Sequence, residues 1–492
     1  MRPLSPAVRA SPSDGGAARM AQNALFKAAS QATRLLSVVF VVVAARQLGP
    51  ERFGKFTVAY AAAVLLGAAL DLGVPAVLTR RVARAPAEAR REWATAALVK
   101  LGLLGPVGLV YALLPVVGGS PADTRAAIWL LGLALVLQSF VELGAAVFAA
   151  QQAVRRELGV RLAEKLVLVG AGFLGLRLGG GLATVCAAFV LAGLVALALT
   201  VALLHRQAAP PPWRELPTRA RTLVREVGLV SLAFVVAFAT TRLVPLVVAF
   251  LAGERAAGYL GAATRVVDVL QVLPVTVTAA VYPVLARTGA RDPRFLPLVR
   301  QTVAVLLLAA LPVVLVLVLA APWIVGVILG AEFRPTATLL AILGPAALLD
   351  VLQFFLGALL LALDRPARLL AAATAALMAS LVLTPILVHA AGARGGALAV
   401  LAVSAVAVGG NMGALAPLVG WPVGAGAVKV VSAAALAALG GGLVPAPARA
   451  VVALGLYGAG VVALRPLPAG LGRRLFRGAL GTVSPVPGSG GG

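Results

Sequence analysis

Cysteine and charged residues are scarce in this chain of 492 residues. A single cysteine, Cys186, excludes an internal disulfide framework and a cysteine-based metal site. Charged residues make up 12% of the sequence and hydrophobic residues 61%, which is more than a soluble core requires. The sequence contains no HExxH, P-loop or GxSxG motif, so we expect no enzyme, no metal and no cofactor. The chain is predicted to be a polytopic membrane protein.

The positive charge has a membrane explanation. A formal net charge of +25 would suggest nucleic acid binding in a soluble domain. Here the basic residues lie mostly in short loops between apolar stretches, where they set topology beside anionic lipid. We therefore expect membrane lipids, and no nucleic acid, as partners.

The apolar stretches predict an all-α fold. A membrane span needs about 20 apolar residues, and a proline or glycine inside it is tolerated. We expect about fourteen spans, with twelve as the alternative, because the fifth is short and only residues 445–449 separate the last two. The expected spans are 28–45, 56–78, 93–117, 126–150, 162–176, 182–204, 227–251, 259–286, 299–321, 337–363, 369–388, 397–418, 428–444 and 450–464.

Arginine clusters predict the orientation. Cytoplasmic loops carry an excess of lysine and arginine, and here the rich clusters follow the even-numbered spans. Both termini are therefore expected in the cytoplasm. The composition predicts disordered cytoplasmic tails at 1–27 and 465–492, and a proline-rich cytoplasmic linker at 205–226.

The two halves of the chain resemble each other. A span with Arg34 precedes GPERFGKF (49–56), as a span with Arg242 precedes AGERAAGYL (252–260). Further on, VLQSFVELGAAVFAAQQAVRRE resembles VLQFFLGALLLALDRPARLL. Chance similarity between apolar spans is the alternative interpretation. The repeat predicts two parallel six-helix lobes around a central cavity, related by an axis along the membrane normal. The expected units are an N-lobe at 28–204, a C-lobe at 227–418 and two extra helices at 419–464.

Arginines inside spans are the main candidate site residues. A charge at the centre of a membrane helix costs about 2.5–3.5 kcal/mol, so Arg34, Arg242 and Arg265 should face the bundle interior. An arginine fork matches phosphate oxygens two at a time, which makes these three candidates for binding a diphosphate. The alternative is ion pairing, of Arg265 with Asp268 or of Arg34 with Asp71.

Other polar residues within spans are weaker candidates. Lys100 is expected to snorkel to the cytoplasmic interface, with a role in the cavity or in coupling as the alternative. Acidic side chains could bind a coupling ion or proton, or neutralise an arginine; these are Asp71, Glu142, Asp268 and Asp350. Amides could contact sugar hydroxyls or join helices; these are Gln31, Gln138, Gln271, Gln353 and Asn411.

Several segments resemble one transporter family. ARQLGPERFGKF (45–56) followed by DLGVPAVLTRRVAR (71–84) is similar to the opening of the polysaccharide and O-antigen (Wzx-type) flippases of the multidrug/oligosaccharidyl-lipid/polysaccharide exporter superfamily. GYLGAATRVVDVLQVLPVTVTAAVYPVLAR (258–287), ILGAEFRPTATLLAIL (328–343) and AGARGGALA (391–399) also resemble family segments. The likeness covers nearly the whole chain.

This resemblance implies a function. It implies alternating access in a bacterial cell membrane, moving an undecaprenyl-diphosphate-linked oligosaccharide to the outer leaflet for cell-surface polysaccharide synthesis. Glycosyltransferases or a polymerase of the same pathway are further candidate partners. Arg34 and Arg265 match arginines of the family pattern, whereas Arg242 rests on the internal repeat. The chain lacks the characteristic opening segment of the lipid II flippases, which puts that substrate in doubt.

Two other function classes remain open. An ion-coupled drug or cation antiporter of the same superfamily would share the lobes, but it would rest on a buried acid rather than on several arginines. A membrane-embedded glycosyltransferase or polymerase would carry a sizeable outer loop with acidic catalytic residues, and the loops here are short.

Overall fold

The structure, a computed structural model, describes residues 14–117, 119–205, 215–226, 229–290, 292–445 and 448–465. Every regular element in these ranges is a helix, which confirms the all-α fold. The elements are α1 (Asp14–Asp71), α2 (Val74–Arg84), η1 (Pro86–Glu88), α3 (Ala89–Val117), α4 (Ala122–Ala150), α5 (Val154–Arg177), α6 (Leu182–His205), α7 (Leu216–Glu226), α8 (Leu229–Ala252), α9 (Glu254–Val267), η3 (Asp268–Gln271), α10 (Val272–Thr288), α11 (Phe295–Leu319), α12 (Ala321–Ile328), η4 (Ala331–Phe333), α13 (Thr336–Ala362), α14 (Pro366–Val419), α15 (Ala425–Gly442) and α16 (Arg449–Leu464).

Ten of the described helices are long and apolar enough to cross a membrane. Two of them contain a break at a glycine of positive φ, Gly49 in α1 (φ 74°) and Gly392 in α14 (φ 55°), where a side chain would be strained. Each break separates two apolar segments that the sequence predicts as separate spans. The protein is therefore a multi-pass membrane protein, and the count of fourteen spans stays a prediction.

Some boundaries differ from those expected. α1 already begins at Asp14, inside the segment expected to form the amino-terminal tail. The second span ends at Asp71 rather than at residue 78, because the left-handed Leu72 and Gly73 interrupt the helix before the amphipathic α2. Residues 1–13 and 466–492 of the expected tails lie outside the described residues, as do residues 206–214 of the expected linker.

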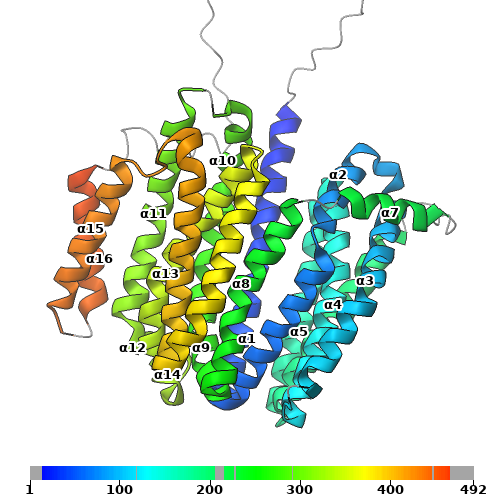
Figure 1. Ribbon diagram of the computed structural model, residues 1–492, viewed down its shortest axis with the longest axis horizontal. Coiled ribbons are helices and arrows are strands. Elements are labelled where there is room, and N and C mark those ends of the chain that lie inside the picture. Colours follow the sequence, from blue (N-terminus) through cyan, green and yellow to red (C-terminus); the bar gives the residue numbers. More distant parts are fainter. Residues whose placement is uncertain are drawn as a thin grey trace, which may run out of the picture.

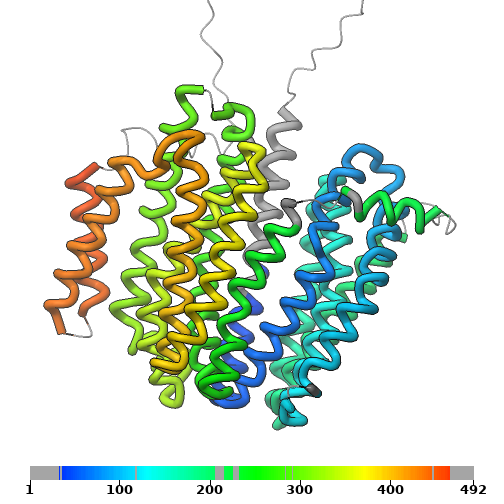
Figure 2. Tube along the Cα trace, in the orientation of Figure 1, coloured from blue at the N-terminus to red at the C-terminus, as the bar shows by residue number. Residues whose placement is uncertain are grey.

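The helices gather in two groups (Figure 1). We call α1 to α6 the N-half and α8 to α14 the C-half; α15 and α16 form a pair at the edge of the C-half. The same path can be followed in Figure 2, from the N-half at the right to the last helices at the left. We call the end of the molecule that carries α12 and η4 the α12 end, and the opposite end, with α2 and α7, the α7 end.

Helix α7, inside the expected linker, is bound to the N-half by ion pairs. Arg219 contacts Glu88 at 2.7 Å and Glu92 at 2.9 Å, and Arg91 pairs with Glu215. At the end of α7, Glu226 accepts two hydrogen bonds from Arg81 of α2, one of 2.6 Å. The chain between the halves is therefore attached to one of them.

Backbone conformations repeat between the halves. Gly49 (φ 74°, ψ 170°) and Gly253 (φ 87°, ψ 165°) match at an offset of 204 residues (253 − 49). Gln152 (φ 55°) and Asp364 (φ 56°), which are not glycines, match at an offset of 212 (364 − 152). Positive φ is uncommon outside glycine, so the match is informative. The fold thus contains the parallel repeat that the sequence predicts.

The halves meet through glycines at the α12 end. A Cβ on Gly54 would lie 1.7 Å from the carbonyl oxygen of Glu254, and a Cβ on Gly258 would lie 1.9 Å from that of Pro50. The two contacts are equivalent under the offset of 204 residues (258 − 54 and 254 − 50). We call this contact of four residues the glycine seam. Beside it, Thr124 of the N-half donates a 2.8 Å hydrogen bond to Glu254.

Candidate functional site

Arg265 lies where the two halves face each other. It sits in the last turn of α9, and its guanidinium carbon is 4.3 Å from the ring centroid of Tyr60 on α1. Its Nη1 is 3.3 Å from Oδ2 of Asp268, the ion pair that the sequence offered as the alternative to phosphate binding. A cation over an aromatic face is attracted by the ring. Arg265 is thus held by one residue from each half.

Arg242 shares this neighbourhood. Arg242 of α8, Arg265, Asp268 and Lys165 of α5 all lie within electrostatic range of the Tyr60 hydroxyl. Arg242 forms no hydrogen bond or ion pair with a described residue, and its buried Nε has no partner there. A buried charged donor without a partner is costly, which favours an anion as its ligand. We call Tyr60, Arg242, Arg265, Asp268 and Lys165 the central cluster.

The helix is broken at this cluster. The apolar segment from Glu254 to Thr288 consists of α9, the 3₁₀ turn η3 (Asp268–Gln271) and α10. Pro274 comes three residues after Gln271, and a proline lacks the amide hydrogen that continues the hydrogen bonding of a helix from the preceding turn. A stretch of 3₁₀ helix inside a long helix often marks a hinge. Arg265 therefore lies just before a candidate hinge, and Asp268 is the first residue of that hinge.

Lys100 does not snorkel, contrary to expectation. Its side chain is fully buried, and its Nζ lies 2.5 Å from Asp71 Oδ1 and 2.7 Å from the Ser139 carbonyl oxygen. Ser139 also donates a 3.0 Å hydrogen bond to Asp71. The expectation was wrong because two other helices of the N-half, α1 and α4, supply polar partners that the sequence of α3 does not reveal. Asp71 is therefore neutralised by Lys100.

Glu142 is neutralised in the same half. Arg161 of α5 donates two hydrogen bonds to it, of 3.0 and 2.9 Å, in the geometry that matches a guanidinium to a carboxylate. Gln138, a candidate sugar contact, donates a 3.0 Å hydrogen bond to Glu142. The structure thus places Glu142 and Gln138 in one network between α4 and α5.

The remaining candidates lie apart from one another. Asp350 of α13 accepts a 2.8 Å hydrogen bond from Ser404 and lies within electrostatic range of Asp268. Asn411 of α14 is 3% exposed, and its Oδ1 has no partner among the described residues. Gln271 lies in η3 and Gln353 in α13, and both are partly buried. The side chains of Gln31 and Arg34 lie outside the described residues.

The sequence reasoning missed Tyr60, Ser139 and Lys165. A phenol inside an apolar span was the available signal for Tyr60, but its contact with Arg265 joins helices of different halves. Lys165 stands among basic residues near the start of an expected span, and nothing in the sequence links it to Tyr60. In the described part of the chain, no group of three or more His, Cys, Asp or Glu side chains is placed to hold a metal ion.

Comparison with known proteins identifies the family. The model of the family described as "Polysaccharide biosynthesis protein" matches residues 20–289, more than half of the chain. The chain belongs to this family. No curated protein shows a significant match to the chain as a whole. The solved structures that resemble the chain are described as a flippase and as transporters.

Solved structures show the fold of this family member. A lipid II flippase MurJ in an inward closed conformation has a TM-score of 0.69 at 14% identity, covering 90% of this chain and 99% of that one. An inward-facing multidrug resistance MATE family transporter of the MOP superfamily has a TM-score of 0.60 at 15% identity, covering 78% and 94%. A MOP superfamily transporter from Pyrococcus furiosus, described by the reverse polarity of its binding pocket, has a TM-score of 0.57 at 15% identity, covering 82% and 95%. The protein therefore shares the all-α fold of these transporters.

Proposed function

We propose that the protein moves an undecaprenyl-diphosphate-linked oligosaccharide from the cytoplasmic to the outer leaflet of a bacterial cell membrane by alternating access. Arg242 carries the proposal: a cation in the middle of the fold, with a buried donor that no described residue satisfies. Arg265 stands in the same cluster. Two guanidinium groups in a low dielectric suit a diphosphate, which offers several charged oxygens.

The family supports a lipid-linked sugar as the substrate. Polysaccharide synthesis at the cell surface needs its lipid-linked unit on the far side of the membrane, and a MurJ-like fold is one that a flippase uses. Arg34 remains a proposed third contact, by its match to the family pattern. The glycan is proposed to contact amides such as Gln271 and Gln353.

We propose that the α7 end faces the cytoplasm. It carries the arginine-rich segments after α2 and around α7, which the positive-inside rule places there. The glycine seam then closes the outer end in this conformation. Opening the seam, with bending at η3, would expose the central cluster to the outside. Such rocking of one parallel repeat against the other is the usual form of alternating access.

A second candidate function is an ion-coupled antiporter. Asp350 is the observation that favours it, because this partly buried acid has a serine but no described basic residue as its hydrogen-bond partner. MATE transporters also share the fold. The central cluster argues against an antiporter for cationic drugs, since its arginines would repel such a substrate.

Flipping in liposomes tests the proposal. The purified protein would be reconstituted with a fluorescent undecaprenyl-diphosphate-oligosaccharide, and its transfer scored with a membrane-impermeant reagent. We expect Arg242→Ala and Arg265→Ala each to slow transfer about tenfold or more, the equivalent of one charged hydrogen bond. Arg294→Ala is the matched control, because Arg294 is 90% exposed and lies outside the cluster.

Two outcomes would count against this reading. If both variants flip at the wild-type rate, the arginines do not contact the diphosphate. If folded wild-type protein flips nothing across several head groups and ion gradients, the antiporter becomes the better hypothesis.

A further inference from the structure

A second cationic site lies at the α12 end of the C-half, away from the central cluster. An open pocket of about 550 Å³ is lined by residues of three segments. Ala252, Arg255, Ala256 and Tyr259 come from the end of α8 and the start of α9, Pro335 and Leu339 from the start of α13, and Ala391, Ala393 and Arg394 from the break in α14. Its volume lies within the range of small-molecule sites.

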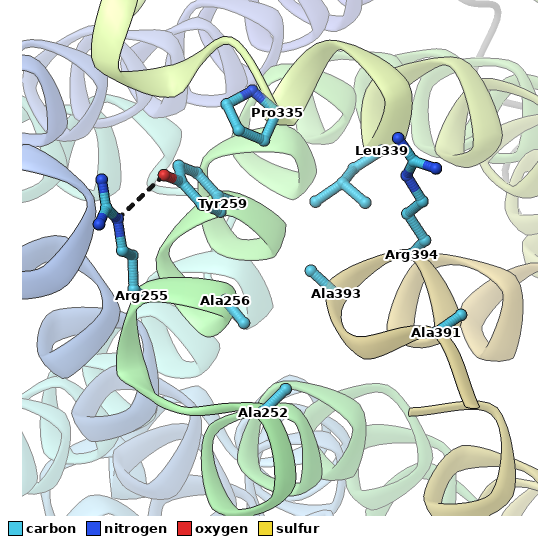
Figure 3. A pocket seen from close by; sticks show the side chains of 9 residues that line it. All are labelled: Ala252, Arg255, Ala256, Tyr259, Pro335, Leu339, Ala391, Ala393 and Arg394. Carbon is cyan, nitrogen blue, oxygen red and sulfur yellow. Dashed lines mark hydrogen bonds between the residues drawn. The ribbon is translucent and has the colours of Figure 1, made fainter. Parts of the chain in front are cut away.

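We propose that this pocket binds the phosphate group of a lipid. Figure 3 shows Arg255 and Arg394 on opposite sides, with Tyr259 and Leu339 between them. No acidic residue is among the nine that line the pocket, so both positive charges stand uncompensated within it. Guanidinium groups bind phosphate oxygens in pairs through parallel hydrogen bonds.

Arg255 is oriented and Arg394 is free. Arg255 donates a 3.1 Å hydrogen bond from Nε to the Tyr259 hydroxyl, which leaves both terminal nitrogens for a ligand. Arg394 makes no hydrogen bond or ion pair with any described residue. The neighbouring acid, Glu254, is engaged elsewhere, since Thr124 and Lys55 both contact it. The two arginines therefore lack the acidic partner that Lys100 and Arg161 of the N-half have.

The surroundings of the pocket favour a lipid over a soluble anion. Phe250 and Leu251, directly before the lining residue Ala252, are 88% and 44% exposed on a membrane helix. Leu398, one turn after Arg394, is 40% exposed. Exposed apolar side chains at the end of a membrane-spanning helix are suited to contact with acyl chains. A phosphate held between the arginines would thus have its apolar chains beside lipid-facing residues.

Two sources could supply the phosphate. One is a phospholipid of the outer leaflet, and this source does not depend on the transport function. The other is the lipid-linked diphosphate leaving after transport, and this source rests on the proposed function. Both present the same chemistry to Arg255 and Arg394.

A cysteine at the pocket rim gives a readout that is independent of transport. Ala391→Cys, in a Cys186→Ser background, places one thiol on an exposed lining position. Its rate of reaction with a maleimide would be measured in a phosphate-free detergent, with dioctanoyl phosphatidylglycerol or farnesyl diphosphate added. Dioctanoylglycerol and farnesol are the matched probes without phosphate.

We expect the phosphate-bearing probes to slow labelling and the uncharged probes to leave it unchanged. Arg255→Ala/Arg394→Ala should raise the concentration needed for protection at least about tenfold. Arg177→Ala, an exposed arginine at the end of α5, should leave protection intact. Arg242→Ala/Arg265→Ala should also leave protection intact, and this result would distinguish the pocket from the central cluster. If the double alanine variant does not fold, Arg255→Gln/Arg394→Gln replaces it in the same measurement.

Equal labelling with phosphate-bearing and uncharged probes would overturn the proposal. Protection that survives removal of both arginines would overturn it as well. Protection by phosphatidylglycerol identifies a phospholipid site, whereas protection by farnesyl diphosphate alone identifies the lipid-linked product; either result supports phosphate binding at this pocket.

Discussion

The N-half and the C-half share a backbone plan, but several of their charged side chains differ in the partners that they have. In the N-half, Lys100 is paired with Asp71 and Arg161 with Glu142, each with further hydrogen bonds. In the C-half, Arg242 and Arg394 have no partner among the described residues, and Arg265 has a single carboxylate at 3.3 Å. A repeated fold therefore does not imply a repeated role.

This difference suggests a division of labour. A buried pair that is fully hydrogen-bonded fixes the relative position of its helices and offers nothing to a ligand. A buried cationic group without a partner, such as Nε of Arg242, destabilises the empty protein and favours a complex with an anion, whereas the exposed Arg394 is solvated until an anion binds. The paired charges of the N-half thus hold its helices together. The C-half carries the arginines that can bind phosphate, and it also contains the helix break at η3.

Breaking the ion pair between Lys100 and Asp71 should have the largest effect on the stability of the fold. Lys100→Met removes the cation from Asp71, whose side chain is 36% exposed, so the cost should be smaller than that of breaking a fully buried pair, which is about 3–5 kcal/mol. We expect a clear fall in thermal unfolding temperature in detergent. The double variant Lys100→Met/Asp71→Leu should recover most of it, because removing both partners is far less costly than removing one. A double variant as unstable as the single one would contradict the pairing.

Substitutions in the glycine seam test whether the two halves contribute equally to the closed contact. Gly54→Ala and Gly258→Ala each put a methyl group within 2 Å of a backbone carbonyl of the other half, so neither can keep the closed seam. We expect both to shift the protein toward an opened α12 end, seen as a longer distance between spin labels on α4 and α9. Gly102→Ala, which has open space around its Cβ, is the control. If only one of the two variants opened the α12 end, the two equivalent contacts would not contribute equally.

Of the three changes, breaking an ion pair of α7 should have the smallest effect on stability. The hydrogen bond from Arg81 holds the pKa of Glu226 below its usual value of 4.5. A carboxylate with a depressed pKa stabilises the docked state above pH 4.5, and this contribution disappears as the pH falls through the lower, folded-state pKa. Half-exposed pairs of this kind contribute about 0–1 kcal/mol.

Hydrogen exchange of α7 would measure this contribution. Glu226→Gln should speed exchange of α7 amides slightly at pH 7, and the difference from wild type should vanish in strong acid. Arg294→Ala should change nothing, because its contact with Asp292 lies in another loop. An unchanged exchange rate in Glu226→Gln would mean that Arg81 does not hold α7.

Several features could be predicted because they are local. The length of an apolar segment predicts a membrane helix. A break in the helix occurs at Gly49, which a proline follows, and again at Gly253, which an acidic residue follows. Arg265 and Asp268 are three residues apart on a helix, so their pairing was an available alternative. The family likeness was readable for the same reason, since its motifs are short and contiguous.

The sequence by itself determined the membrane class, the helices, the parallel repeat and the family, because hydrophobicity and backbone conformation act over a few turns. The tertiary structure alone decided which charges are neutralised. Lys100 meets Ser139 across 39 residues, and Arg265 meets Tyr60 from the other half. Such partners depend on which helices pack together, so arginines that look alike in sequence become a structural link in one half and a candidate binding group in the other.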